Sequence, residues 1–297
     1  MEVFTIQNSY PRLNHTAVTL GKFDGIHKGH RKLTEKILEQ KKEGRTAVLI
    51  AIEAGDSWIL SRSERRSLLE RMGIDILIEA PLDERMRAMK AESFVSEILV
   101  GDLGVSYVAV GEDNRFGCER KGDWRLLQKM GHKAGFEVEV VPRQMDGKRK
   151  ISSTYIREEL RSGNMEKVNW LMDTPFFAEG PVVHGQGLGH KKLLPTVNIL
   201  PDPGKLMPPN GVYFTVSGFE DRVFHGITNV GTRPTVGGSF VSIESYLFDC
   251  DEDLYGRNCR VEFLHFLRSE RKFSSLEALR LQLLEDAGKG KAYFEQF

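Results

Sequence analysis

The sequence has few cysteines, and their placement excludes two kinds of structure. There are three among 297 residues, Cys118, Cys250 and Cys259, without a CxxC spacing. An odd number at scattered positions argues against a disulfide framework and against a structural zinc site. The same pattern is typical of proteins in a reducing compartment. We therefore expect a cytoplasmic protein.

The sequence also lacks an excess of charge and a long apolar run. Lysine and arginine together number 42, as do aspartate and glutamate, so no net charge favours a polyanionic partner such as nucleic acid. No apolar run approaches the roughly 20 residues that span a bilayer. The first residues, MEVFTIQNSYPRL, do not resemble a signal peptide. We expect neither nucleic acid nor a membrane as partner, and a monomer or weak oligomer.

Strand-like and helix-like segments alternate in the first half of the chain. Strands are expected over 15–21, 46–52, 74–80, 105–113 and 136–142, and helices over 30–45, 61–73, 91–104 and 123–135. This alternation predicts a parallel sheet with helices on both faces. Ligands bind beyond the carboxyl ends of the strands in such sheets. Three loops lie there: residues 21–30, residues 111–122 and the stretch after Pro142.

Near residue 172 the pattern changes to short strand-like runs separated by glycine and proline. Such runs predict an antiparallel barrel or sandwich. We therefore expect two domains, residues 1–172 and 173–297.

Two helices are expected outside this alternation. One covers 153–172, packs on the first domain and leads into the second. The other follows Ser274 or Ser275, either of which is a suitable N-cap, and breaks near Gly288.

The stretch GKFDGIHKGH, residues 21–30, combines glycines with two histidines between a strand and a helix. Unpaired N–H groups at a helix start bind anions, and glycine lets the backbone approach a phosphate. His27 and His30 share one helical face. Their imidazoles can donate hydrogen bonds to a phosphate whose charge grows in a transition state, as nucleotidyl transfer requires. A lone HxxH is usually structural or exposed, but the glycines and the strand–loop–helix context favour phosphate binding.

Two further stretches of the first half carry chemistry. VGEDNRFG, residues 110–117, ends a strand, and ISSTYIREEL, residues 151–160, begins a helix. The hydroxyls of Ser152, Ser153 and Thr154 can cap that helix or bind phosphate, and capping would be favoured if this stretch stood alone. Arg157 is a permanently charged fork for phosphate oxygens.

Together these three stretches resemble the GxFDGxHxGH, VGxDFxFG and ISSTxIR motifs of bacterial bifunctional riboflavin kinase/FAD synthetases. The resemblance implies a Rossmann-like nucleotidyltransferase domain that joins FMN and ATP, with His27 and His30 as catalytic residues. It implies that Asp113 and Phe116 bind the flavin. The residues that it implies for ATP and phosphate are Gly21, Phe23, Asp24, Gly25, Gly29, Ser152, Ser153, Thr154 and Arg157.

The first half departs from the family pattern in one region. The family usually carries a TFDPHP-like segment after the second strand, where this chain has AVLIAIEAGDSWIL. Asn114 also stands where phenylalanine is usual. Glu53, Asp56 or Trp58 are candidates for part of the missing role. An alternative therefore stays open, in which only the kinase is active and the adenylyltransferase domain is degenerate.

In the second half, LLPTVNI places a hydroxyl and a carboxamide two residues apart. In a strand, Thr196 and Asn198 point to the same face, where they can hold hydrated Mg²⁺ and a nucleotide phosphate. The glycine-rich, basic stretch VVHGQGLGHKK that precedes them could cover phosphates. For PTVN by itself, an edge strand after a turn is the more common explanation.

Three stretches of this half resemble riboflavin kinases. They match the patterns GxGRxxGxPTAN, NVGxRPTVGG and, over SIESYLFDCDEDLYGRNCRVEFLHFLRSERKF, the segment that follows in the family. His190 and Leu193 replace the usual arginine and glycine of the first pattern. The resemblance implies a six-stranded antiparallel barrel with a C-terminal helix. It implies Glu244 as the catalytic base, Gly187, Gly189, Thr196 and Asn198 for ATP, Thr196 and Asn198 for Mg²⁺, and Asn229 and Arg268 for the flavin.

The favoured hypothesis is a bifunctional enzyme that uses riboflavin, FMN and ATP as substrates and forms FAD. The kinase-only alternative remains. A flavin- or nucleotide-binding regulatory protein without turnover is disfavoured, because the motif histidines, Thr196, Asn198 and Glu244 are all retained.

Overall fold

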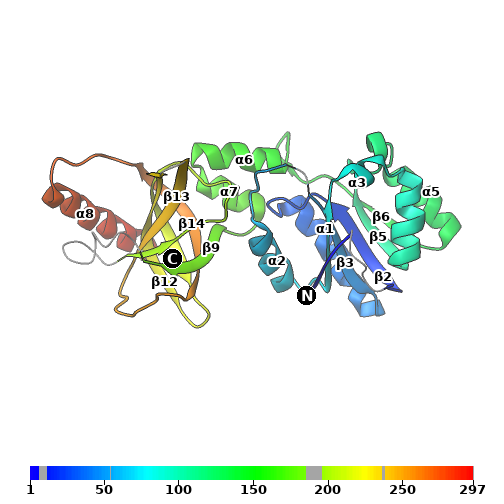
Figure 1. Ribbon diagram of the computed structural model, residues 1–297, viewed down its shortest axis with the longest axis horizontal. Helices are drawn as coiled ribbons and strands as arrows, with labels where there is room; N and C mark the ends of the chain where they lie inside the picture. The colour runs from blue at the N-terminus through cyan, green and yellow to red at the C-terminus, as the bar shows by residue number, and fades with distance from the viewer. Residues whose placement is uncertain (7–11, 54, 185–195, 236–237, 297) are drawn as a thin grey trace. The chain divides into compact units, whose positions relative to one another are not determined.

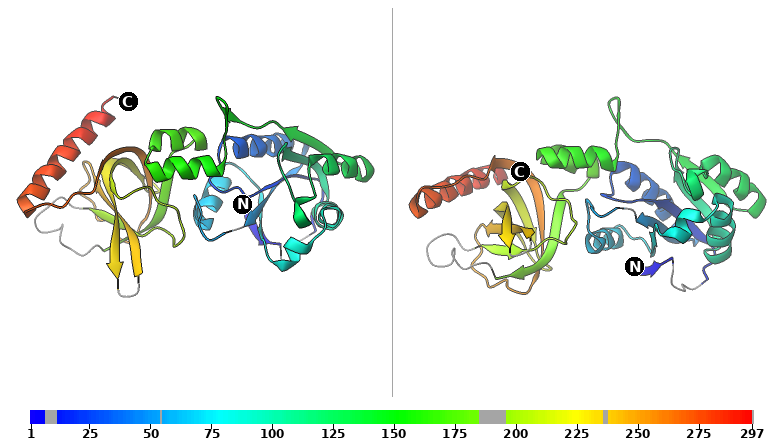
Figure 2. Two further views of the ribbon diagram at one scale, coloured as in Figure 1. Left: turned by 90° about the horizontal axis from the view of Figure 1, so that it is seen from above. Right: turned by 45° about the horizontal axis from the view of Figure 1, so that its top comes forward.

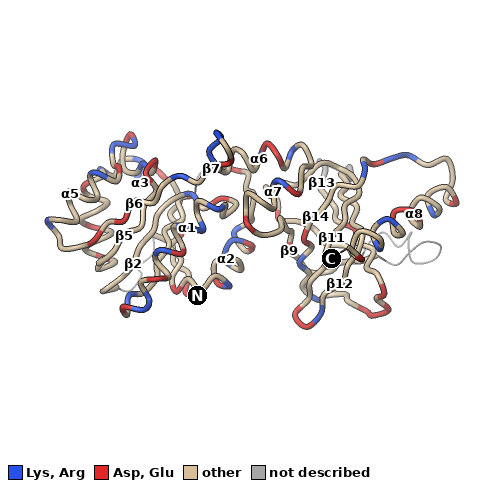
Figure 3. The backbone as a smooth tube through the Cα atoms, turned by 180° about the vertical axis from the view of Figure 1, so that it is seen from behind, with Lys and Arg blue, Asp and Glu red and all other residues tan. Residues whose placement is uncertain are grey.

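The computed structural model describes residues 1–6, 12–53, 55–184, 196–235 and 238–296. The chain forms two compact units. The first comprises Met1–Trp58 and Arg62–Ser153, and the second Ile59–Ser61 and Thr154–Phe297. Basic and acidic residues are interspersed along the backbone of both units (Figure 3).

The first unit is built on a sheet of six parallel strands in the order β1-β4-β3-β2-β5-β6 (Figure 1). The central strands are filled with buried apolar residues on both faces, as parallel sheets require. The predicted parallel sheet is confirmed, and β1 is an additional strand that was not predicted. The strands are β1 (Glu2–Thr5), β2 (Thr16–Gly21), β3 (Thr46–Glu53), β4 (Ile76–Pro81), β5 (Val105–Gly111) and β6 (Glu137–Val141).

Helices flank this sheet. From β2 to β4 the strands advance in one direction, and from β4 the chain returns to β5 on the other side of β2. Right-handed crossovers therefore put α1 and α2 on one face and η2 and α5 on the other. The helices are α1 (Lys28–Glu39), η1 (Gln40–Glu43), α2 (Arg62–Arg71), α3 (Glu84–Ala88), α4 (Ala91–Ser93), η2 (Phe94–Asp102), η3 (Cys118–Arg120) and α5 (Trp124–Ala134), and a hairpin joins β7 (Met145–Asp146) to β8 (Arg149–Lys150).

The segment predicted as one helix over 153–172 forms two, α6 (Ser153–Ser162) and α7 (Met165–Met172), so that prediction was wrong (Figure 2). Gly163 has a φ of 79°, a left-handed conformation that ends the first helix. Asn164 then caps α7, and its side chain accepts a hydrogen bond from the backbone N of Lys167.

Helix α7 packs on strands β9 and β14 of the second unit. Asn169 Nδ2 donates to the carbonyl of Phe263 over 2.8 Å, and Asn169 Oδ1 accepts from the backbone N of Phe176 over 2.8 Å. The expectation that this segment packs on the first domain is therefore wrong for α7.

The second unit contains a closed antiparallel barrel with strand order β10-β13-β12-β11-β14-β9. The barrel implied by the family resemblance is confirmed, and the sandwich is not. Three hydroxyls, Thr215, Thr228 and Ser245, form a buried chain with oxygen–oxygen distances of 2.6 and 2.7 Å. The strands are β9 (Phe176–Val183), β10 (Val197–Ile199), β11 (Gly211–Gly218), β12 (Val223–Thr235), β13 (Gly238–Leu247) and β14 (Asn258–Ser269).

The predicted C-terminal helix is α8 (Leu276–Phe294), and Ser275 caps it by accepting from the N of Ala278 over 3.1 Å. The break predicted near Gly288 was wrong, because the helix continues through it. Gly290 brings the helix close to the barrel: a Cβ there would lie 2.8 Å from the ring of Phe248.

Candidate functional site

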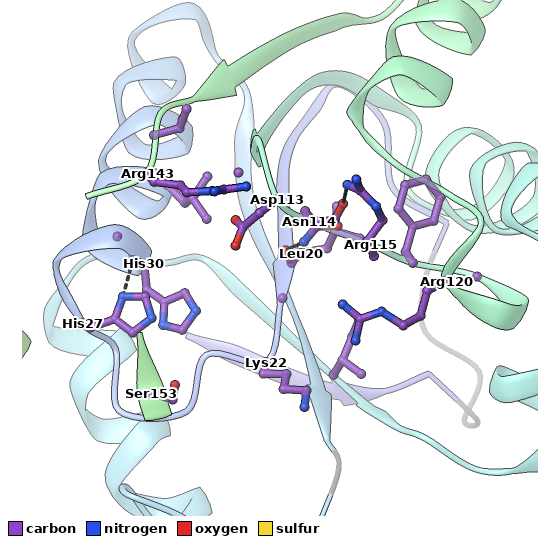
Figure 4. A pocket seen from close by; sticks show the side chains of 18 of the residues that line it. Leu20, Lys22, His27, His30, Asp113, Asn114, Arg115, Arg120, Arg143 and Ser153 are labelled. Atoms are coloured by element: carbon purple, nitrogen blue, oxygen red, sulfur yellow. Dashed lines mark hydrogen bonds between the residues drawn. The ribbon is translucent and has the colours of Figure 1, made fainter. Parts of the chain in front are cut away.

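A cavity of about 640 Å³ lies at the carboxyl ends of the parallel strands, within the first unit. The loops after β2, β5 and β6 all line it, as the sequence predicted (Figure 4). Strands β2 and β5 are neighbours, and the chain reverses direction across the sheet between them. This is the position at which open α/β sheets bind nucleotides.

The loop from β2 to α1 has an unusual backbone. Phe23 and Ile26 have φ angles of 46° and 40°, and Gly25 has 84°. The left-handed region is costly for a β-branched residue such as isoleucine, and strain of this kind clusters at functional sites. The loop is thus a preformed turn that delivers His27 to the first turn of the helix.

His27 is the N-cap of α1, and its Nδ1 accepts a hydrogen bond from the backbone N of His30 over 3.3 Å. Because Nδ1 is an acceptor, the proton of the neutral ring lies on Nε2. The two imidazoles stack with centroids 3.8 Å apart and planes at 14°. Gly29 makes room for this stack, since a Cβ there would lie 3.1 Å from two atoms of the His27 ring.

Both histidines are held neutral. Burial, followed by the positive charge of Lys150, lowers the pKa of His27 from 6.5 to about 4. Burial, followed by His27 and Lys150, lowers the pKa of His30 well below its usual value. Among the described residues, nothing hydrogen-bonds to the buried Nδ1 of His30. At neutral pH the pair can therefore offer hydrogen bonds to a phosphate, but no positive charge.

Positive charge comes from six other side chains around the cavity. Two of them are paired with carboxylates: Lys150 with Asp113, and Arg143 with Glu112 over 3.2 Å. Of the residues that the structure describes, only two acidic ones, Asp113 and Glu119, line the cavity. This excess of cations suits a polyphosphate ligand. The cations are Lys22, Arg87, Arg115, Arg120, Arg143 and Lys150.

The sequence-predicted residues of this unit fall into two groups. Those that line the cavity are Gly21, His27, Gly29, His30, Asp113, Phe116 and Ser153. Those that do not line it, although they are neighbours in sequence, are Phe23, Asp24, Gly25, Ser152, Thr154 and Arg157.

Several of the predicted residues that do not line the cavity hold in place those that do. Phe23 is fully buried, and its ring lies 4.5 Å from that of His30. Ser153 Oγ donates to the carbonyl of Asp24 over 2.6 Å, which ties the start of α6 to the histidine loop. Thr154 and Arg157 follow on α6 and belong to the second unit. Their assignment to ATP stays a prediction.

The three residues offered as substitutes for the missing segment, Glu53, Asp56 and Trp58, do not line the cavity. The Glu53 carboxylate accepts from Arg62 over 2.5 Å and from Arg65 over 2.6 Å. Arg65 also donates to Glu79 over 2.9 Å, so Glu53 belongs to a buried ion network.

The cavity has an apolar wall, of which the sequence predicted only Phe116. Met86 and Met89 come from α3 and the residue that follows it, and Phe94 packs against Phe116 with ring centroids 5.6 Å apart. Such a wall suits a planar aromatic ring. The only sequence signal was the position of α3 after the carboxyl end of β4. The wall residues are Ile52, Leu82, Met86, Met89, Phe94 and Phe116.

The predicted kinase residues gather on three neighbouring strands. Asn198 on β10 lies opposite Glu244 on β13, and Glu244 lies opposite Asn229 on β12. Side chains directly opposite each other face the same side of a sheet. Ser245, the next residue, faces the buried hydroxyl chain, so alternation turns this trio to the other side of the barrel wall.

The surroundings of this trio are polar. Oε1 of Glu244 is buried. Asn229 and Glu270 flank Gly231: a Cβ there would lie 3.2 Å from Asn229 Nδ2 and 2.8 Å from Glu270 Oε1. Thr196 directly precedes β10. Carboxylate, carboxamide and hydroxyl oxygens are the ligands that Mg²⁺ uses.

The remaining predicted kinase residues are Gly187, Gly189 and Arg268. Gly187 and Gly189 lie outside the described residues. Arg268 is engaged in structure, because its Nη2 donates to the fully buried Asp286 of α8 over 2.6 Å. Its assignment to the flavin stays a prediction.

The described ranges, residues 1–6, 12–53, 55–184, 196–235 and 238–296, lack two features. No helix among them is long and apolar enough to cross a membrane. They contain no group of three or more histidine, cysteine, aspartate or glutamate side chains placed to hold a metal ion.

Two family models match the chain. The FAD synthetase model matches residues 10–155, and the riboflavin kinase model matches residues 172–294. The bifunctional riboflavin kinase/FMN adenylyltransferase of Escherichia coli (strain K12) is 34% identical over 289 residues, which cover 93% of this chain and 92% of that protein. Its counterpart in Pseudomonas fluorescens is 32% identical over 299 residues, covering 97% and 96%.

A solved structure is similar over nearly the whole chain. It is that of a Streptococcus pneumoniae protein described as a macrolide-efflux protein, with a TM-score of 0.84 and 27% identity, and the similarity covers 97% of this chain and 98% of that one. An FAD synthetase domain and a riboflavin kinase domain are thus both present here. With relatives above 30% identity over more than nine-tenths of its length, the chain belongs to the bifunctional riboflavin kinase/FMN adenylyltransferase family.

Proposed function

We propose that the two units catalyse successive steps of flavin cofactor synthesis. The barrel unit transfers the γ-phosphate of ATP to riboflavin and forms FMN. The α/β unit joins FMN to the AMP part of a second ATP, forming FAD and releasing pyrophosphate. The match of one family model to each half supports this division of labour.

In the adenylylation step, a phosphate oxygen of FMN attacks the α-phosphorus of ATP while the bond to the β-phosphate breaks. The protein performs little covalent chemistry, so positioning and charge stabilisation carry the catalysis. We assign hydrogen bonding to the ATP phosphates to Nε2–H of His27 and to His30, at the start of α1. The stacked, neutral pair at the cavity supports this assignment.

The kinase-only alternative rests on the missing TFDPHP-like segment. It has no support if other residues take the role of that segment. The intact histidine pair in a cationic cavity with an apolar wall is the observation that favours an active adenylyltransferase. We propose that Asp113 and the apolar wall serve the flavin.

In the phosphorylation step, we assign Glu244 as the base that takes the proton from the ribityl 5′-hydroxyl as it attacks the γ-phosphorus. Thr196 and Asn198 would hold Mg²⁺, which neutralises phosphate charge when it is bound. The register of Asn198 opposite Glu244 supports a site at this point of the barrel wall. Asn229, beside Glu244, is assigned to riboflavin.

Other expectations from the sequence stay proposals. We place the domain boundary after residue 172, where the riboflavin kinase model begins, although the compact units change at Ser153 and Thr154. A cytoplasmic location, a monomeric or weakly oligomeric state and the lack of nucleic-acid and membrane partners also remain proposals.

One assay of both half-reactions tests the proposal. Purified protein with Mg²⁺ and ATP is given either riboflavin or FMN, and the flavins are separated by chromatography. We expect FMN followed by FAD from riboflavin, and FAD from FMN. FMN formation without any FAD would support the kinase-only alternative, and neither product would overturn both.

A further inference from the structure

Two of the cations that line the cavity differ from the rest. The side chains of Lys22 and Arg120 make no hydrogen bond or ion pair with any described residue, whereas the side chain of each of the other four has a partner within the protein. Those partners are Asp113 for Lys150, Glu112 for Arg143, the Leu82 carbonyl for Arg87 and the Asn114 carbonyl for Arg115. The two unpartnered cations can therefore bind an anion without breaking an internal interaction.

Arg120 is presented by a constrained loop. Glu119 and Arg120 both have left-handed φ angles, 54° and 59°, which residues other than glycine rarely adopt. The loop is closed by the Phe116–Gly122 bridge, with N–O distances of 3.1 and 2.9 Å. A strained conformation that the surroundings enforce often marks a functional position. In Figure 4 the Arg120 side chain reaches from this loop toward the interior of the cavity.

The loop of Arg120 also adjoins the apolar wall. The backbone N of Cys118 donates to the carbonyl of Met89 over 2.7 Å, and a Cβ on Gly117 would lie 2.6 Å from Ala91. Lys22 directly follows β2, at the start of the loop that carries the histidines. One cation thus stands beside the wall suited to an aromatic ring, and the other beside the pair suited to ATP.

The adenylylation reaction requires positive charge between these two regions. The phosphate of FMN and the triphosphate of ATP repel each other as they approach. The neutral histidines donate hydrogen bonds but cannot neutralise this charge. A guanidinium and an ammonium group that have no internal carboxylate partner can do so.

We propose that Lys22 and Arg120 bind the phosphate of FMN and hold it beside the α-phosphorus of ATP. This inference rests on the proposed adenylyltransferase function. Arg120 takes two of the three terminal phosphate oxygens through its planar fork, and Lys22 contacts one of the same two oxygens as a point charge. The attacking oxygen is left free to form the bond to the α-phosphorus, and pyrophosphate leaves from the opposite side.

The experiment is FAD synthesis by the full chain carrying Arg120→Ala or Lys22→Ala, with FMN and ATP varied separately. Loss of a charge-assisted contact predicts a rise in KM for FMN of about 10- to 100-fold in each variant. KM for ATP should change less than about twofold, since only the flavin phosphate is affected. Arg120→Lys should recover part of the loss, because it restores the charge without the fork.

Lys121→Ala is the matched control. Lys121 is the next residue, is 73% exposed, pairs with Glu119 and does not line the cavity. It removes the same charge from the same loop and should leave both KM values unchanged. Riboflavin phosphorylation should be unchanged in all variants, which verifies that the barrel unit is folded, and an unchanged KM for ATP verifies the fold of the first unit.

A phosphate-free flavin separates a phosphate contact from a general effect on the cavity. Lumiflavin carries the isoalloxazine ring without a phosphate and should inhibit FAD synthesis with the same inhibition constant in wild type and Arg120→Ala. A parallel loss of lumiflavin binding, an equal rise in KM for ATP, or an unchanged KM for FMN would each overturn the inference. Failure of the wild type to form FAD would instead overturn the proposed adenylyltransferase function.

Discussion

The two candidate sites obtain their geometry in different ways. In the α/β unit the site lies on loops, and its precision comes from left-handed backbone at Phe23 and Ile26 and from the stacking of His27 on His30. In the barrel the trio of Asn198, Glu244 and Asn229 is aligned by strand register alone. A loop site depends on each backbone angle, whereas a register site depends on strand pairing.

The two sites also differ in how charge is handled. The loop site keeps its histidines neutral by burial and carries cations around them. The barrel site places a carboxylate beside two carboxamides. The first arrangement suits binding of polyanions and the second suits proton removal and metal binding. Variants at each site should therefore affect one reaction and spare the other.

The largest expected effect is at the barrel site. Glu244→Gln keeps the shape of the side chain but removes the base, so riboflavin phosphorylation should fall by about 100- to 10,000-fold. Adenylylation of supplied FMN should continue at the wild-type rate, measured by chromatography of FAD. Loss of both activities in a folded variant would mean that the two reactions do not occupy separate sites.

The corresponding change at the loop site is His30→Ala. Removal of a preorganised donor to phosphate should lower kcat for FAD formation by about 100- to 1,000-fold. Phosphorylation of riboflavin should remain normal. The exposed His132 of α5 offers a control, since His132→Ala removes an imidazole of the same unit far from these contacts. Equal losses in the two variants would contradict the assignment.

The neutral state of buried His27 predicts that the stability of the protein depends on pH. The pKa of His27 is about 4 in the folded protein, and its usual value of 6.5 applies to the unfolded chain. As the pH falls, the unfolded chain therefore takes up the proton before the folded protein does. The contribution of neutral His27 to the free energy of unfolding is complete above pH 6.5 and is lost as the pH falls toward 4. This difference in pKa between the folded and unfolded chain corresponds to about 3 kcal/mol in the free energy of unfolding.

This dependence can be measured by calorimetric melting between pH 7.5 and pH 4, values chosen to span the window of about 2.5 units set by the lowered pKa. His27→Asn retains a good N-cap acceptor but cannot titrate. The variant should therefore lose less stability on acidification than the wild type does. Parallel curves for the two proteins would contradict a buried, neutral His27.

The smallest expected effect tests the close packing of the loop site. Gly29→Ala adds a Cβ 3.1 Å from the His27 ring, which must then shift by a few tenths of an ångström. We expect KM for ATP to rise about fivefold, equivalent to about 1 kcal/mol. Gly288→Ala on α8 is the counterpart in the other unit, where a Cβ meets nothing within 4 Å. It should leave both reactions unchanged.

Much of the fold follows from local sequence patterns. The apolar runs of β2 to β6 and the amphipathic α1 and α5 are visible because burial dictates residue type. Strand β1 and the hairpin β7–β8 were missed because they are short. The break between α6 and α7 could have been predicted, because Gly163 followed by Asn164 is a helix stop followed by a helix start.

The candidate sites were predictable only where their residues are close in sequence. His27 and His30 belong to one loop, and their role follows from local composition. Lys150 and Arg120 reach the same cavity from segments 90 or more residues further along the chain, and only the sheet order brings them together. The alignment of Asn198 with Glu244 likewise depends on strand pairing, which residue type alone does not specify.

The attachment of α7 to the barrel has a practical consequence for anyone who wishes to divide this chain. A fragment that starts at residue 173 would strip Asn169 from the carbonyl of Phe263 and from the N of Phe176. It would also expose the apolar underside of β9 and β14 that Val168 and Leu171 shield. A fragment that starts just before α6 would keep these contacts. The isolated kinase unit would then retain the helix that packs on its barrel.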